Sequence, residues 1–273
     1  MSAPRVGVVQ FPGVNCEAES VRALELAGLA GEIFRWTRPP GELRDYAAYV
    51  LPGGFAYQDR VRAGALAAKD PLVDVLAEEA ARGKPLLGVC NGAQVLVEAG
   101  LVPGGGAVEV ALARNRMPGR GGYYARWVTL KVESSPCVFT ATIPAGTLLP
   151  LPIAHGEGRF TAHEGGRLTA LARAGQAPMR YAAARGTIAR AFPDNPNGAE
   201  GAIAGLCNAR GNVLALMPHP ERAVDLGSLA RGIGGEWGER FDHAVERGDA
   251  TALLGAGPGL ALFESLARHL GVA

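Results

Sequence analysis

The segment from Lys84 to Leu96 constrains the fold of this chain more than any other part of the sequence. Pro85 to Val89 is a short apolar run, entered from a Gly-Lys-Pro breaker, and predicts a buried strand, whereas Gln94 to Ala99 favours a helix. Cys90 therefore falls on a strand-to-helix turn. Gly88 and Gly92 flank it at the spacing of a nucleophile elbow, in which small neighbours permit a sharp bend that exposes the reactive side chain.

A helix that begins near Asn91 would direct its unpaired backbone N–H groups and its positive dipole end at the sulfur of Cys90. This field favours the thiolate, which is the attacking form of cysteine, and the same N–H groups can hold an oxyanion. The alternative is a buried cysteine that only fills space beside a helix cap. The two matched glycines favour the nucleophile.

The length and composition fit an ordinary globular protein. The chain has 273 residues, of which 48% are hydrophobic and 19% charged, with no break in composition, so we expect a single domain over residues 1–273. The net charge of +1, without blocks of like charge, argues against nucleic acid or an anionic membrane as the main partner.

The cellular compartment is inferred from three features. The first residues enter a strand-like run without a secretory signal pattern, and no apolar run reaches the ~20 residues of a spanning helix. The four cysteines are scattered and lack paired metal-ligand spacing, as is typical of reduced thiols. We therefore expect a cytoplasmic protein without a metal site.

Strands alternate with helices in the first half of the chain, which predicts an α/β fold with a largely parallel, open twisted sheet flanked by helices. A hairpin of Ala202–Cys207 and Asn212–Met217 adds a smaller antiparallel part, and a final helix covers about Leu260–Leu270. The glycine- and arginine-rich stretch from Leu101 to Gly122 is expected to be an irregular surface excursion. The remaining predicted strands are Arg5–Phe11, Glu32–Trp36, Tyr49–Leu51 and Arg126–Val132.

Sites in open α/β sheets lie beyond the carboxyl ends of the strands. Three loops of this chain have that position: Gly13 to Cys16, Pro52 to Phe55 and Cys90 to Gly92. We expect them to meet in one crevice.

A cysteine nucleophile needs a base, and His219 is the strongest of five candidates because two prolines fix it at a strand end. Glu221 follows two residues later. In an extended backbone such residues face the same side, so the carboxylate can orient the imidazole and raise its basicity. Cys90, His219 and Glu221 thus form a predicted Cys-His-Glu triad.

Cys16 is the rival nucleophile, because it also follows a strand and precedes a helix. It lacks flanking glycines of the elbow type, and Glu17 and Glu19 in the first helical turn would oppose a thiolate. Cys90 is therefore preferred.

At these residues the chain resembles the class I, triad-type glutamine amidotransferases, through Gly-Val-Cys90-Asn-Gly and Pro-His219-Pro-Glu221. Within that family it is most similar to the glutaminase subunits of phosphoribosylformylglycinamidine synthase. The further segments that carry this resemblance are Asn15-Cys16, Leu51–Phe55, Arg62–Ala65, Gly88–Gln94, Pro152–Phe160, Asn195–Gly198 and Met217–Arg222.

The resemblance implies a flavodoxin-like fold and hydrolysis of L-glutamine to glutamate and ammonia through a thioester on Cys90. It places the oxyanion hole and substrate contacts at Gly53, Gly54, Asn91 and Gln94. It also implies that ammonia passes to a synthetase subunit, which holds ATP and Mg and amidates formylglycinamide ribonucleotide in purine biosynthesis, and that a small third subunit joins the complex.

The residues agree with a site for ATP on another chain, because no glycine-rich phosphate loop that ends in Gly-Lys-Ser/Thr is present. His155, Glu157 and Arg159 form a Gly-spaced polar run that is a candidate for partner or ammonia-exit contacts, with a solvated turn as the alternative.

The chain departs from the family pattern at Pro12, at Gln58, where glycine is common, and at Ala93, where a larger aromatic residue is common.

Three other functions fit the sequence less well. A thiol esterase of the α/β-hydrolase type expects its acid on a loop before the histidine, a glutaminase for another synthetase would lack the run from His155 to Phe160, and a scaffold with a dead site would not keep the triad.

Overall fold

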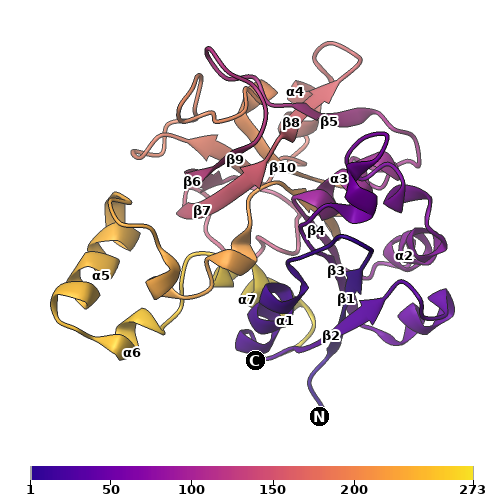
Figure 1. The fold of residues 1–273 in the computed structure, drawn as a ribbon, viewed down its shortest axis with the longest axis horizontal. Helices are drawn as coiled ribbons and strands as arrows, with labels where there is room; N and C mark the ends of the chain where they lie inside the picture. The colour runs from indigo at the N-terminus through magenta and orange to yellow at the C-terminus, as the bar shows by residue number, and fades with distance from the viewer. Residues whose placement is uncertain (1, 273) are drawn as a thin grey trace.

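The first part of the chain alternates strands and helices, as predicted (Figure 1). The structure is a computed structural model and describes residues 2 to 272. The elements of this part are β1 Arg5–Gln10, α1 Glu17–Leu26, β2 Ala30–Arg35, β3 Ala48–Leu51, α2 Pro71–Ala81, β4 Leu86–Val89 and α3 Asn91–Glu98.

The second part is richer in strands and ends in helices. Its elements are β5 Val110–Arg114, β6 Tyr124–Val132, β7 Leu148–His155, β8 Glu157–Ala162, α4 Arg167–Arg173, β9 Met179–Ala182, β10 Ile203–Cys207, β11 Val213–Leu216, α5 Gly235–Glu246, α6 Ala250–Leu253 and α7 Leu260–His269. The predicted hairpin is present as β10 and β11, and the predicted final helix as α7.

One sheet of nine strands organises the molecule, in the order β2-β1-β3-β4-β11-β10-β9-β6-β7. The strands from β2 to β11 pair in parallel, and those from β11 to β7 pair antiparallel. β5 and β8 form a second, two-stranded sheet. The predicted class, a largely parallel sheet with helices and a smaller antiparallel part, is confirmed, although the antiparallel strands are more numerous than the hairpin alone indicated.

The parallel pairing of β11 with β4 decides where the site lies. Leu216 is paired with Val89, so both strands end at the same edge of the sheet. The residues that follow β1, β3, β4 and β11 therefore leave the sheet together, as expected for an open α/β fold.

The prediction of an irregular excursion from Leu101 to Gly122 is wrong in its middle. Residues Val110–Arg114 form β5, which pairs antiparallel with β8, beginning with Val110 opposite Ala162. The partner strand lies about fifty residues downstream, and the glycines around this short run conceal its alternation of buried and half-buried residues.

Helix ends follow the local signals in the sequence. Asp70 caps α2 because its Oδ1 accepts the backbone N–H of Leu72 at 2.9 Å, and Pro71 occupies the first helical position. The Asp70 carboxylate also accepts a hydrogen bond from the Tyr57 hydroxyl at 2.8 Å. The cap thus ties the start of α2 to the loop that follows β3.

The C-terminal helices have different positions. α7 lies beside α1 and buries Leu262, Phe263 and Leu266 in the main core, whereas α5 and α6 form an arm at one side of the molecule (Figure 1). The arm has its own small apolar cluster, which includes Leu226 and Phe241. None of the helices among residues 2 to 272 combines the length and apolar character that crossing a lipid bilayer requires.

The elbow depends on the close approach of α3 to the end of β3. A Cβ atom added at Gly92 would lie 1.9 Å from the carbonyl oxygen of Leu51. We therefore predict that Gly92→Ala lowers the free energy of unfolding by about 3 kcal/mol, the upper end of the usual cost of overpacking. Chemical denaturation measures this cost.

Gly165→Ala is the matched control, because no atom lies within 4 Å of a Cβ added there. Equal stability of the two variants would show that the approach of α3 to β3 carries no strain.

Candidate active site

Cys90 stands at the start of α3 in a strained backbone conformation. Its φ is 50° and its ψ is −104°, values that a residue with a side chain rarely adopts and that mark functional turns. Gly88 permits this turn, since a Cβ there would lie 2.6 Å from the carbonyl oxygen of Gly92. The thiol of Cys90 donates to the carbonyl of Ala154 at 3.5 Å, which fixes the direction of the sulfur.

A cavity of about 320 Å³ opens above Cys90. Gly54 and Gln94 line it, and so do four ionisable side chains of both signs, Asp59, Arg62, Arg114 and Glu157. A small zwitterion such as an amino acid needs partners of both signs, and the cavity is within the size range of small-molecule sites. Burial raises the pKa of Asp59.

Asn91 and Gln94 support this cavity from α3. The Asn91 side chain accepts the backbone N–H of Ala56 at 2.8 Å and donates to Asp59 and to Gln94, at 3.0 and 2.9 Å. Gln94 in turn donates to the backbone carbonyl of Glu157 at 2.7 Å. These side chains are occupied within the protein, so the group that Asn91 can offer to an oxyanion is its backbone N–H at the start of α3.

The predicted oxyanion residues of the other loop have separate positions. Gly54 lines the cavity, with a φ of 147° that favours glycine. Gly53 lies under the base, because a Cβ there would come within 2.6 Å of His219 Cε1. The assignment of an oxyanion hole to this turn stays a prediction.

His219 and Glu221 form the predicted pair. His219 Nδ1 lies 2.5 Å from Glu221 Oε1, and both residues are buried. The backbone N–H of His219 donates to Pro152 at 2.8 Å, which attaches the pair to β7. The extended backbone that we expected is absent, since Pro220–Arg222 is a 3₁₀ turn. The turn still brings the carboxylate to the imidazole because it folds back over a single proline.

The environment of His219 favours its protonated form. Burial alone would lower the pKa of His219, but the charge of Glu221 and the neighbouring sulfur of Cys90 raise it well above its usual value. Nε2 is buried and has no hydrogen-bond partner among residues 2 to 272. This nitrogen is therefore free to exchange a proton with a thiol or a substrate.

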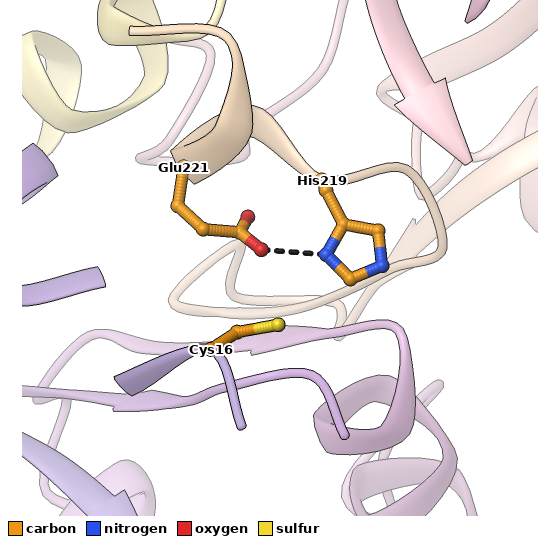
Figure 2. Close-up of side chains that lie close together, drawn as sticks. All are labelled: Cys16, His219 and Glu221. Carbon is orange, nitrogen blue, oxygen red and sulfur yellow. Dashed lines mark hydrogen bonds and ion pairs between the residues drawn. The ribbon is translucent and has the colours of Figure 1, made fainter. Parts of the chain in front are cut away.

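Cys16, the rival nucleophile, lies beside the pair (Figure 2). Its sulfur and the ligand atoms of His219 and Glu221 are all within 4.8 Å of one another. Cys16 is fully buried, whereas Cys90 retains 5% exposure and opens to the cavity. A substrate in the cavity meets Cys90 first.

Three such donors can in principle hold a metal ion. Here the imidazole and the carboxylate bond to each other, and the guanidinium of Arg222 donates to the sulfur of Cys16 at 2.9 Å. A metal ion would meet that positive charge, so the cluster suits acid–base chemistry. That the protein works without a metal stays a prediction.

His155 lines the cavity and is held as a neutral imidazole. Burial and the nearby His219 lower the pKa of His155 to about 3. Asn115 donates its amide to the carbonyls of His155 and Gly122, at 2.8 and 3.2 Å, which directs its oxygen toward His155 Nδ1 at 3.1 Å. The network assigns the proton to Nδ1, and Nε2 has a lone pair without a partner among the described residues.

Other residues of the candidate run have less direct roles. Glu157 lines the cavity, whereas Arg159 lies away from it and donates to the Arg114 carbonyl at 3.1 Å. Sequence reasoning assigned no role to Asn115, Arg222 or Tyr123. Arg222 ends the segment Met217–Arg222 that carries the family resemblance, whereas Asn115 and Tyr123 stand in or next to loops without a motif. Gln58 adopts a φ of 61°, which explains why glycine suits this position.

An elbow thiol beside a buried His–Glu pair is the arrangement of a triad glutamine amidotransferase. In agreement, residues 3–246 match the family model described as a CobB/CobQ-like glutamine amidotransferase domain. The chain is 43% identical to the phosphoribosylformylglycinamidine synthase subunit PurQ of Methanothrix thermoacetophila, an alignment that covers 97% of this chain and 98% of the relative.

Two further comparisons agree. The PurQ subunit of Thermomicrobium roseum is 44% identical, with 88% of this chain and 94% of the relative covered. A chain in the solved structure of PurLQS from Thermotoga maritima superposes with a TM-score of 0.71 at 32% identity, over 98% of this chain and 99% of that one. The chain belongs to the PurQ family of glutamine amidotransferases.

The structure predicts which sulfur reacts. An electrophile that mimics glutamine should modify Cys90, because this thiol lies on the cavity next to a base, and the label can be located by mass spectrometry of the digested protein. Cys90→Ser should abolish labelling, and Cys16→Ser should leave it at Cys90. Modification of Cys16 in the native protein would overturn the assignment.

Proposed function

We propose that this chain is the glutaminase subunit of a phosphoribosylformylglycinamidine synthase, which hydrolyses L-glutamine to glutamate and ammonia. The observation that carries the proposal is the cavity that contains Cys90 next to the buried His219–Glu221 pair, in a chain 43% identical to a PurQ subunit over nearly its whole length. The single domain over residues 1–273 that we expected remains part of this proposal.

In the proposed mechanism His219 takes the proton of the Cys90 thiol, and the thiolate attacks the side-chain amide carbon of glutamine. The oxyanion that forms is stabilised by backbone N–H groups at the start of α3 and at Gly54. His219 then gives its proton to the leaving nitrogen, so ammonia departs and a glutamyl thioester remains. Water, deprotonated by His219, hydrolyses the thioester to glutamate and restores the thiol.

The proposed partner is a synthetase subunit that uses ATP and Mg to transfer the ammonia to formylglycinamide ribonucleotide, with a small third subunit in the complex. The sequence supports this division of labour, because it has no phosphate-binding loop of the Gly-Lys-Ser/Thr type. We place the reaction in the cytoplasm, for which the four free cysteines are suited.

The mouth of the cavity has an apolar rim that such a partner can cover. Val61 is 90% exposed, and Phe55 and Tyr123 are 45% and 57% exposed with ring centroids 6.5 Å apart. Val61 also has a φ of 72°, which strains a β-branched residue. The strain and exposure of Val61 indicate a loop that adopts its final conformation only when a partner binds.

We therefore expect the isolated chain to hydrolyse glutamine slowly, and the synthetase with its substrates to raise the rate by about tenfold or more, a size common for coupled sites. Val61→Asp should weaken this activation, and Leu254→Asp, at an apolar residue that follows α6 and is 73% exposed, should not. Ammonia release assayed with and without the synthetase measures both effects. Full activity of the isolated chain would refute the coupling.

His155 is the proposed contact for the departing ammonia, because its Nε2 is an acceptor without a partner in a residue that lines the cavity. His155→Leu removes a hydrogen bond of about 1 kcal/mol, so the yield of synthetase product per glutamine hydrolysed should fall by roughly fivefold. Glu157→Gln keeps the shape of the turn and tests the neighbouring carboxylate. Unchanged coupling in both variants would dismiss a role for this run in ammonia transfer.

A further inference from the structure

Arg222 follows the triad carboxylate directly in the sequence, yet it is bonded elsewhere. Its Nη2 donates to the sulfur of Cys16 at 2.9 Å, and its Nε lies 3.9 Å from Glu19 on α1. Glu221 Oε2 is buried and has no hydrogen-bond partner among residues 2 to 272. A guanidinium and an unpartnered carboxylate oxygen thus stand side by side in the chain without forming a bond.

The position of the Cys16 sulfur explains this separation. The thiol donates to Asn15 Oδ1 at 3.2 Å and accepts from Arg222. The same sulfur lies beside the imidazole and contributes to the raised pKa of His219. Only glycine at position 53 permits the sulfur and the imidazole to lie together, because a Cβ there would come within 2.6 Å of His219 Cε1 and 3.2 Å of Cys16 Sγ. Figure 2 shows the sulfur directed at the space between the imidazole and the carboxylate.

If Arg222 paired with Glu221, two cations would share one carboxylate. The bond between Glu221 and His219 would then stabilise the imidazolium less, since part of the negative charge would be neutralised by the guanidinium. The sulfur is the only acceptor that holds Arg222 Nη2 among the described residues. Glu221 already acts on Arg222 through space, because its charge is among the causes that raise the pKa of Arg222.

We propose that Cys16 is a positioning residue whose sulfur holds the guanidinium of Arg222 apart from Glu221, so that this carboxylate hydrogen-bonds to His219 and not to Arg222. The inference rests on the proposed function in one respect, which is that His219 acts as the base. It assigns no chemistry to Cys16 itself. The Cys16 thiol, which resembled a second nucleophile, instead keeps the guanidinium of Arg222 from pairing with Glu221 of the His219–Glu221 pair.

Other ionisable groups act on the same imidazole. Tyr123 from the loop before β6 and His155 from β7 interact with the cluster through space and stay in place in the test, whereas Cys90, which also raises the pKa of His219, is replaced in every protein that is compared. Asp225 is paired with Arg22 of α1 at 2.6 Å. These groups are identical in all variants, so a difference between variants arises from Cys16 and Arg222.

The experiment is an NMR titration of the His219 imidazole in full-length protein with Cys90→Ala, which removes the reactive thiol. Cys16→Ala should lower the pKa of His219 by about one unit, a tenfold loss of proton affinity. Cys16→Ser keeps a donor and an acceptor and should restore most of that pKa. The double variant Cys16→Ala/Arg222→Met should recover most of the loss, because no guanidinium is left to pair with Glu221 and only the direct contact of Cys16 with the imidazole is missing.

Two controls separate this role from loss of packing. Cys137→Ala removes an equally buried sulfur outside the site and should not move the His219 pKa. Arg222→Met alone should change it by less than about 0.5 unit, since Arg222 is already held away from the carboxylate. If Cys16→Ala fails to fold, Arg222→Met alone decides. A rise of about one unit in the pKa of His219 would show that Arg222 competes for Glu221 in the native protein and would contradict the proposal.

An unchanged pKa in Cys16→Ala, or a shift that persists in the double variant, would overturn the proposal. The titration does not depend on glutamine, so its failure leaves the proposed function intact. The opposite outcome is also distinguishable. If the pKa shifts are as expected but the protein releases no ammonia from glutamine, alone or with the synthetase, the proposed function is rejected and the role of Cys16 in holding Arg222 still stands.

Discussion

The contact between the first turn of α3 and the end of β3 is the constraint on which the site depends. Gly92 lies against the carbonyl of Leu51 at a distance that no side chain allows, and this approach requires the tight, strained turn at Cys90. The turn directs the sulfur away from the sheet. It also directs the N-terminus of α3 toward the cavity. Strain in one residue is thus maintained by a tightly packed core around it.

The second half of the site comes from strand pairing. β11 joins the parallel part of the sheet beside β4, although its other neighbour, β10, runs antiparallel to it. The residues after β11 therefore leave the sheet at the edge where Cys90 stands. A base that is 129 residues away in the sequence reaches the nucleophile by this topology, and its carboxylate follows over a single 3₁₀ turn.

Electrostatics within the buried cluster then sets the chemistry. The Glu221 carboxylate contacts the imidazole of His219 and is adjacent in sequence to the guanidinium of Arg222. In a low-dielectric site, a carboxylate stabilises most strongly the cation that it contacts. The thiol of Cys16 gives Arg222 an acceptor of its own. His155 is kept neutral by burial, so the cluster contains one imidazole that is ready to be charged and one that is not.

Much of this arrangement was predictable from local patterns. The alternation of apolar runs and breakers indicated the parallel strands, and the paired glycines around Cys90 indicated the elbow, because both follow from backbone sterics over a few residues. β5 was missed because its partner, β8, is remote and its own pattern is short. The extended geometry expected between His219 and Glu221 was wrong, although the contact itself is present.

The sequence by itself determined the alternation of strands and helices in the first half, the elbow and the identity of the His–Glu pair, since each depends on residues that are neighbours in the chain. Only the tertiary structure decided what surrounds them. Asn115 sets the proton position on His155, and Cys16 and Arg222 meet across 206 positions, because hydrogen bonds between remote loops depend on how the sheet brings its edges together. No local pattern encodes such distances.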